Sequence, residues 1–307
     1  MDKILSKNKG SILMEAMVAM AIFVVGMSFV LLLFVSSSKG AIYSLEGTKA
    51  SLISTQSMEA MRSILNDRGW LPVGTYEVGL KDDKEWDIIS TEGLVGHWKL
   101  SGDARDYSGN GNDGTLMGGV TWAEDRMGQA RGAGDFDGES GYVEVDSLSN
   151  VGENNITYSL WVKPNTNGHN GAAVYTFDTF MGRHETGNSG DLSVGYRADN
   201  KVRVYYENLS TGNYIDSINP IIINEWTYVT VVTDSSSVSL YVNGVLNSIG
   251  NIATNFVIDK MGIGNAILDT WTTHFNGQID DVRIYNRALS AEEIKLLYES
   301  YNPILKI

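Results

Sequence analysis

The pattern of apolar and polar positions divides the chain into two parts. Residues 11–35 form an almost unbroken apolar run, and over residues 36–66 apolar side chains recur at three- and four-residue intervals. Both features predict helix, so we expect one long helix over 11–66. From 93 to 301 the pattern changes to short alternating stretches separated by turn residues, which is typical of strands.

The alternating part predicts an antiparallel two-sheet β-sandwich. In TYSLWVK, Tyr158, Leu160 and Val162 alternate with polar residues and Trp161. Strand pairs meet at Asp199-Asn200 and at Asn243-Gly244, and Asn-Gly is the strongest short hairpin signal. The 33 glycines against 4 prolines suit a domain with many tight turns. One helix is expected at the end, where Ser290 and Glu293 form a capping box.

Charge and cysteine content narrow the classes of function. A net charge of -14 argues against nucleic acid as a partner, because phosphates would be repelled. The chain has no cysteine, so disulfides and cysteine-ligated zinc are excluded. An exported domain without disulfides needs another stabilising cross-link, and an acidic chain favours a bound calcium ion in that role.

The first segment predicts a single membrane crossing. Residues 1–10 carry three lysines against one acid, and residues 12–35 contain about 20 apolar residues beyond Glu15, enough to span a bilayer. The basic flank should stay inside, so the C-terminal domain lies outside the inner, or cytoplasmic, membrane. A carboxylate at Glu15 is costly in lipid and calls for a partner.

Lys9-Gly10, Ser11, an apolar run and Glu15 together resemble the class III signal of type IV prepilins and pseudopilins. The resemblance implies a leader over 1–10, cleavage between Gly10 and Ser11 by a prepilin peptidase, and methylation of the new amine. It also implies that Glu15 pairs with the amine of a neighbouring pilin subunit, which satisfies two buried charges at once. Ser11 departs from the Phe usual in major pilins. Residues 67–92 resemble the short strand-turn-strand region of PilV-like minor pilins.

A second resemblance covers residues 93–301. GLVGHWKLSG, DYSGNGNDGTL, SLWVKP, LYVNG and IDDVRIYNRALSAEEI are similar, in order, to the LamG-like jelly-roll family, which is concanavalin A-like. This implies two curved antiparallel sheets, often with a structural calcium, that bind glycans or proteins.

The loop after the first strand suggests where calcium binds. Asp106, Ser108, Asn110 and Asn112 alternate as in the first half of an EF-hand loop, but the acidic twelfth residue is missing. An acid must therefore come from elsewhere, and alternation lets only one of Asp280 and Asp281 point correctly. Because the family tends to bring its first loop to its last strand, we favour Asp281. An ordinary Asn/Gly turn remains the alternative.

Other motifs give no catalytic site. Residues 109–114 match G-x-G-x-x-G, but no helix is expected after them, so a dinucleotide site is rejected. A glucanase site needs two glutamates and an aspartate on one strand. Glu144 and Asp146 match part of this spacing, but no second glutamate follows them. The four histidines, His97, His169, His184 and His274, are too scattered for a local metal or triad motif. Among the larger aromatics we expect about half to be core, and none is assigned to ligand binding.

The sequence therefore predicts a minor pilin or pseudopilin-like subunit that displays a LamG-like module for adhesion or for recognition of a glycan or protein. Expected partners are the prepilin peptidase, other pilin subunits, the membrane and a surface ligand. One alternative is a single-pass surface protein that never enters a filament. A glycoside hydrolase is the third reading, and the missing glutamate disfavours it.

Overall fold

The computed structural model describes residues 77–80, 86–148, 151, 154–168, 177–183, 191–208, 211–251, 256, 258–267 and 274–300, together with Met20, Thr55, Glu59 and 62–63. The chain divides into two compact units, Met1–Gly69 and Trp70–Ile307, and nearly all described residues belong to the second. The predicted leader and helix over 11–66, with Gly10, Ser11 and Glu15, lie outside the described residues apart from the five isolated positions. Within the described part of the chain, no helix has the length and apolarity needed to cross a membrane.

The second unit is a sandwich of two large antiparallel sheets. We call the first the back sheet, in which strands lie in the order β15-β14-β13-β8-β18-β6-β5, with β3 also paired to β18. Its strands are β3 (Leu94–Trp98), β5 (Thr121–Ala123), β6 (Ala133–Asp137), β8 (Ile156–Pro164), β13 (Thr227–Thr233), β14 (Ser237–Val242), β15 (Val245–Asn251) and β18 (Asn276–Tyr285).

The second sheet, the front sheet, has the order β12-β11-β10-β9-β16-β7-β4, with β17 beside β9. Its strands are β4 (Thr115–Met117), β7 (Tyr142–Val145), β9 (Asp178–Arg183), β10 (Leu192–Tyr196), β11 (Val202–Asn208), β12 (Thr211–Asp216), β16 (Met261–Ile263) and β17 (Ala266–Ile267). Among the described strands, only β17 runs parallel to its neighbour. A separate hairpin, β1 (Glu77–Leu80) with β2 (Trp86–Ile89), falls in the region expected to be strand-turn-strand.

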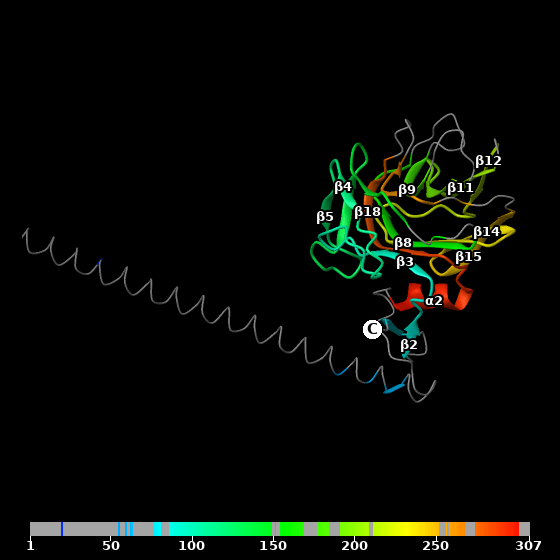
Figure 1. Ribbon diagram of the computed structural model, residues 1–307. Helices are drawn as coiled ribbons and strands as arrows, with labels where there is room; N and C mark the ends of the chain where they lie inside the picture. The colour runs from blue at the N-terminus through cyan, green and yellow to red at the C-terminus, as the bar shows by residue number, and fades with distance from the viewer. Residues whose placement is uncertain are drawn as a thin grey trace, which may run out of the picture. The chain divides into compact units, whose positions relative to one another are not determined.

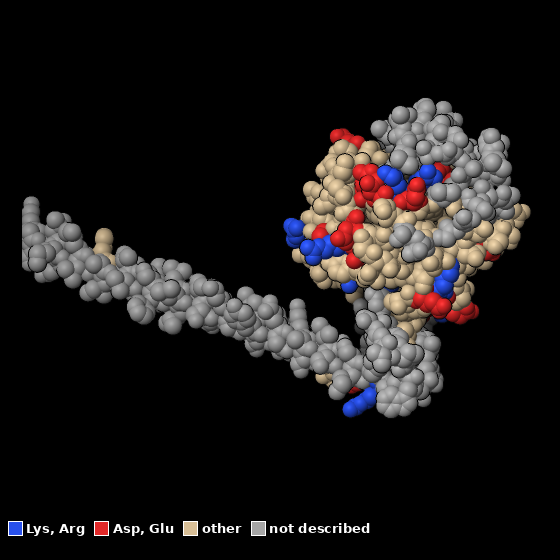
Figure 2. Space-filling view, viewed as in Figure 1, with Lys and Arg blue, Asp and Glu red and all other residues tan. Residues whose placement is uncertain are grey.

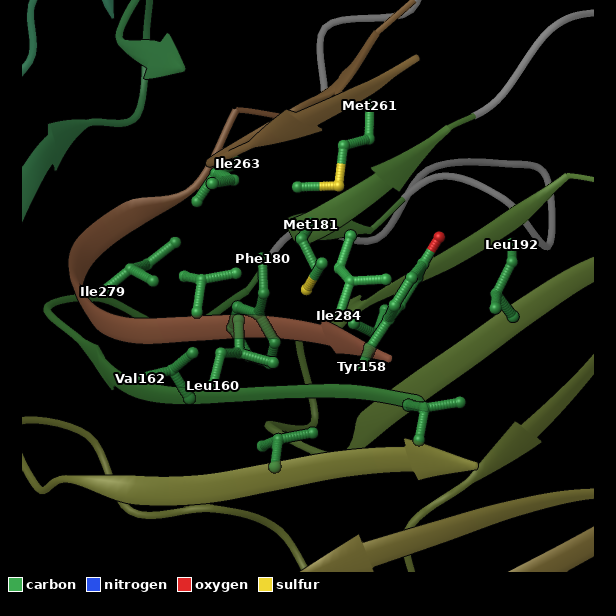
Figure 3. Packing of buried hydrophobic residues seen from close by; sticks show 14 of the residues in the cluster. Tyr158, Leu160, Val162, Phe180, Met181, Leu192, Met261, Ile263, Ile279 and Ile284 are labelled. Atoms are coloured by element: carbon green, nitrogen blue, oxygen red, sulfur yellow. The ribbon is translucent and has the colours of Figure 1, made fainter. Parts of the chain in front are cut away.

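The main core lies between the two sheets. Tyr158, Leu160 and Val162 on β8 alternate inward and meet side chains from β9 and β16 such as Phe180 and Met261 (Figure 3). All of these side chains are almost fully buried. At roughly 1.5–3 kcal/mol for each large apolar side chain removed from water, this layer is the main stabilising contribution to the domain.

A second apolar cluster covers the outer face of the back sheet. Helix α2 (Ala291–Ser300) places Ile294 and Leu297 against Trp161, Tyr228 and Tyr285. In Figure 1, α2 lies beside β3 and β15, on the side of the back sheet away from the front sheet. The back sheet is therefore buried on both faces over part of its area, which explains why Trp161 is inside although it alternates away from the main core.

The local predictions in the strand region are confirmed. The two expected hairpins are β10-β11 and β14-β15, and Asn243 and Gly244 both have the positive φ that this tight turn requires. The capping box is present: Glu293 N donates to Ser290 Oγ at 3.2 Å, and Ser290 N donates to Glu293 Oε2 at 2.9 Å. Residues 109–114 lead into strand β4, not a helix, in agreement with rejection of the dinucleotide motif.

Candidate functional site

Strand β18 brings distant parts of the chain to one place. It occupies the middle of the back sheet; it pairs with β8 on one side along nearly its whole length, and on the other side with β6 at its start and with β3 at its end. In the β3 register, His97 lies opposite Arg283, and Trp98 forms a further bridge to Asp106. The first loop and the last strand are therefore neighbours, as the resemblance implied.

Asp106 is the centre of the first loop. Its Oδ1 accepts hydrogen bonds from the backbone N–H groups of His97 (2.9 Å) and Ser108 (2.8 Å). Its Oδ2 accepts from Ser108 Oγ (2.8 Å) and from the backbone N–H of Asn112 (2.9 Å). Four donors thus converge on one carboxylate, which closes the loop over itself.

The two asparagines of the loop face strand β3. Asn110 Nδ2 donates to the carbonyl oxygens of Leu94 (2.8 Å) and Val95 (3.0 Å), and Asn112 Nδ2 donates to Val95 O at 2.8 Å. The carbonyl of Asn112 in turn accepts from the buried Trp98 Nε1 at 2.9 Å. These bonds fasten the loop to the edge of the back sheet.

The predicted calcium ligands are therefore only partly brought together. Asp106, Asn110 and Asn112 share the loop, but Asp281 is held by His97, whose Nε2–H donates to Asp281 Oδ1 at 2.6 Å. The carboxylate of Asp106 is fully used by N–H and O–H donors, and the amide nitrogens point to carbonyls. No group of three His, Asp or Glu side chains suited to a metal occurs among the described residues. This arrangement does not fit a calcium cage, and calcium stays a prediction from the sequence.

A bulge places both Asp280 and Asp281 on the outer side of β18. The β18–β8 register shifts between Asp280 and Arg283, and Asp281 has a φ of 52°. The expectation that strand alternation would allow only one of the two to point this way is wrong, because a bulge breaks the period of two. A non-glycine residue in the left-handed region is uncommon and marks a locally enforced backbone.

The two carboxylates are compensated by buried cations. Arg126 pairs with Asp280 Oδ2, and its Nη2 lies 3.7 Å from Asp281 Oδ2. Arg283 Nε lies 3.3 Å from Asp281 Oδ1. The Arg126 guanidinium also lies over the Trp161 ring, 5.2 Å from its centroid. No side chain in this group is more than 8% exposed, so we call Asp280, Asp281, His97, Arg126 and Arg283 the buried charge cluster.

Arg126 reaches the cluster because Asp125 shapes the turn that carries it. Asp125 Oδ1 accepts from the backbone N–H groups of Met127 (2.7 Å) and Gln129 (2.8 Å). The Asp125 carboxylate packs so close to Gly132 that a Cβ at this position would lie 2.6 Å from Asp125 Oδ2. The turn directs Arg126 inward and leaves Met127 41% exposed.

An open cleft of about 440 Å³ lies over the cluster. His97, Arg126, Asp280 and Asp281 line it from the buried side. Exposed polar side chains line it as well, namely Lys99, Ser101 and Gln129. Lys99 Nζ lies 4.8 Å from the centroid of the Tyr107 ring, which is 48% exposed. The cleft thus offers hydrogen-bonding groups, and one of them, Lys99, contacts an exposed aromatic ring.

The pKa values of the two adjacent acids are shifted in opposite directions. Burial raises the pKa of Asp280 to about 7; the negative charges of Asp281 and Asp125 add to this effect, and Arg126 opposes it. Burial also acts to raise the pKa of Asp281, but Arg283, His97 and Arg126 outweigh it and hold that pKa well below its usual range. At neutral pH Asp281 is the anion on which the cluster is organised.

The two acids considered for a glucanase site lie in or next to the front sheet. Glu144 is on β7 and points away from the core, while its neighbours Val143 and Val145 are buried. Asp146, just after β7, forms an exposed ion pair with Lys260. These two acids are consistent with the polar face expected of this strand.

The histidines and aromatics are mostly structural. His97 joins the buried charge cluster and His274 packs near Tyr142, while His169 and His184 lie outside the described residues. Of the large aromatics weighed from the sequence, those described are buried or packed against a core: Trp122, Trp161, Trp226, Tyr196, Tyr205 and Tyr206. Trp271 is not among the described residues. The exposed ring of Tyr107 and the buried Arg126 were missed, because no local pattern distinguishes them.

Residues 137–295, just over half of the chain, match the family model of the concanavalin A-like lectin/glucanases superfamily. The chain belongs to this superfamily. The LamG-like, concanavalin A-like jelly roll expected from the sequence is thereby confirmed. No curated protein matches the chain.

Solved structures of the superfamily fold are similar to this chain. Domain 4 of AbnA, a GH43 extracellular arabinanase from Geobacillus stearothermophilus in complex with arabinotriose, is 24% identical, with a TM-score of 0.52 over 66% of this chain and 96% of that one. The receptor binding domain of botulinum neurotoxin C/D mosaic serotype is 16% identical, with a TM-score of 0.51 over 69% of this chain and 52% of that one. The binding domain of Paraclostridial Mosquitocidal Protein 1 is also 16% identical, with a TM-score of 0.55 over 69% of this chain and 53% of that one. The chain spans about half of each toxin domain, and these identities show a shared fold alone.

We predict that Asp280 makes stability depend on pH. A folded-state pKa of about 7, above the ordinary 3.8, means that the folded protein holds this proton more tightly than the unfolded chain. Its contribution is complete below about pH 4 and is lost as the pH rises to about 7. The free energy of unfolding, measured with urea, should therefore fall between pH 5 and 7 more in the wild type than in Asp280→Asn. Equal pH dependence in the two proteins would refute this assignment.

We predict that Asp106→Ala lowers the melting temperature both in calcium and in chelator, because four hydrogen bonds are lost in either condition. Asp106→Asn, which keeps one carbonyl acceptor, should be less destabilising. Thermal unfolding curves recorded with calcium and with chelator also test the calcium site. A wild-type melting temperature that rises with calcium, by a difference that Asp106→Ala and Asp281→Ala abolish, would establish that site; identical wild-type curves would exclude it.

Proposed function

We propose that this domain is a non-catalytic binding module that recognises a glycan in the cleft beside β18. The observation that carries the proposal is the cleft itself, with Lys99, Ser101 and Gln129 along it and the exposed ring of Tyr107 in contact with Lys99. Sugars are bound by hydrogen bonds to their hydroxyl groups and by contact of an aromatic ring with their apolar faces. Similar structures that are named as binding domains, and one in complex with arabinotriose, favour this class of function.

The acids of the cleft do not suit hydrolysis. A glycosidase needs two carboxyl groups that reach the scissile bond from opposite sides, about 5 Å or more apart. Asp280 and Asp281 are consecutive, nearly buried and engaged with Arg126, His97 and Arg283. Asp125 is used by the backbone of its own turn. Binding without turnover is the function that these contacts support.

The attachment of the module is a second part of the proposal. The basic leader, Gly10, Ser11 and Glu15 support a minor pilin or pseudopilin-like subunit that carries the module to a filament surface for adhesion. The family match begins at residue 137 and does not reach this segment. A membrane-anchored protein that stays outside any filament is the alternative, and the basic flank and apolar run support it equally.

Glycan binding should depend on Tyr107. The full chain, purified in detergent, is applied to an array that includes arabinan oligosaccharides and sialylated glycans, and Kd is then measured for the strongest hit. We expect micromolar to millimolar Kd, and a loss of at least about tenfold in Tyr107→Ala and in Lys99→Ala.

Tyr214→Ala is the matched control, because this ring is 44% exposed but lies on β12. Binding that is equally weakened by Tyr214→Ala, or unchanged by Tyr107→Ala, contradicts the assignment of the cleft. Release of reducing sugar from any bound glycan contradicts the non-catalytic role.

Processing should occur between Gly10 and Ser11. In a host with a prepilin peptidase, the intact mass of the membrane-extracted protein should correspond to a chain that begins at Ser11, with or without one added methyl group. Glu15→Gln should be processed and folded normally but enter filaments less, because it no longer offers a carboxylate to a neighbour's amine. A mature chain that begins at Met1, or after residue 35, rules out the prepilin role.

A further inference from the structure

One edge of the sandwich exposes large apolar side chains. Val245, Leu246 and Ile249 on β15 are 68%, 47% and 60% exposed, and Ile218 and Ile222, between β12 and β13, are 65% and 59% exposed. Monomeric proteins scatter single exposed apolar residues over their surface, whereas a gathered set indicates a contact surface.

These residues come from two segments that the structure holds together. The backbone N–H of Ile218 donates to Asn247 Oδ1 at 2.8 Å, and Ser248 Oγ donates to the carbonyl of Asp216 at 2.7 Å. Ile222 and Asn247 line the same small hollow. We call the surface made by β15 and residues 217–224 the β15 edge.

The β15 edge carries no charge. Residues 235–258 contain no Asp, Glu, Lys or Arg, although one residue in five is charged in the chain as a whole. Residues 217–224 are also free of charge. By contrast, Figure 2 shows Asp and Glu side chains next to Lys and Arg in small groups on the face in view.

Strand β15 is also an outermost strand of the back sheet. It pairs with β14 on one side, and the sheet order ends with it. Tyr206 Oη donates to the carbonyl of Asn251 at 3.1 Å, so the end of β15 is bonded to β11, and the rest of the edge is left for a partner. Edge strands usually carry charges or proline that prevent pairing with another chain, and β15 has neither. Its one irregularity is the bulge at Asn247, opposite Leu240 and Tyr241.

We propose that the β15 edge is the surface through which two copies of this chain associate about a twofold axis. Each copy has a net charge of -14, so two copies repel each other on average as they approach. The β15 edge avoids that repulsion, and its apolar side chains gain by leaving water. A strand edge is also complementary to its own copy in the antiparallel orientation, as a twofold interface requires.

The proposed contact leaves the cleft open. In the back sheet, β15 is at one end, and β14, β13 and β8 separate it from β18. The cleft is lined by β18 and by the turn that follows β5. Two copies joined through β15 would therefore present two clefts far from the contact, which raises the avidity for a repetitive ligand. The association itself does not depend on the proposed glycan binding.

The absence of cysteine gives a direct test. The full chain is prepared in detergent as Ile249→Cys and, as a control, as Leu116→Cys, whose side chain is 45% exposed on β4 at the far edge of the front sheet. Because a disulfide needs Cα atoms within about 7 Å, mild oxidation should give a covalent dimer with Ile249→Cys only. No dimer, or equal yields from the two variants, overturns the proposal.

A charge at the same position gives the second measurement. Ile249→Glu brings two like charges together across the contact, so sedimentation in detergent should show at least a tenfold weaker dimer than the wild type or Leu116→Glu. Circular dichroism checks that the variants are folded. A dimer of Ile249→Glu as strong as the wild-type dimer shows that another surface, such as the N-terminal segment, joins the copies and overturns the proposal. Loss of dimer without loss of glycan binding separates this surface from the cleft.

Discussion

Two neighbouring carboxylates on one buried strand impose the condition that organises this end of the domain. A carboxylate removed from water costs several kcal/mol unless cations and hydrogen-bond donors replace the lost solvent. Asp281 is satisfied by His97 and Arg283, and Asp280 by Arg126. Those partners come from β3, from β18 itself and from the turn after β5, so the charges can be compensated only when all three segments are in place.

The same condition connects the polar cluster to the apolar one. Arg126 lies over Trp161, which packs against Tyr228 and against Tyr298 near the end of α2. A change in the ion pairs therefore reaches the packing of the terminal helix through one aromatic ring. The buried side of the cleft is thus formed by side chains held in ion pairs and ring contacts, while the groups proposed to meet a ligand, Lys99 and Tyr107, are on exposed parts of the chain.

Local features were predictable from the sequence, and long-range ones were not. Asn243-Gly244 determines its own turn, and Ser290 with Glu293 determines its own helix start, because the interacting atoms are within a few residues. The bulge at Asp281 was missed because period-two alternation assumes a regular strand. Arg126 was missed because its partners are some 154 residues away in the chain. The family resemblance supplied what spacing could not, namely that the first loop meets the last strand.

The central place of β18 has a consequence for how the domain is made. This strand is the last of the sandwich, yet it lies between β8, β6 and β3, all of which are synthesised more than a hundred residues earlier. Until residues 276–285 emerge, the back sheet is divided and exposes unpaired strand edges. Non-local pairing of this kind slows folding, and incomplete chains of this kind tend to aggregate. A truncation within β18 should therefore abolish folding of the whole sandwich, so the domain acquires its structure only as its synthesis is finished.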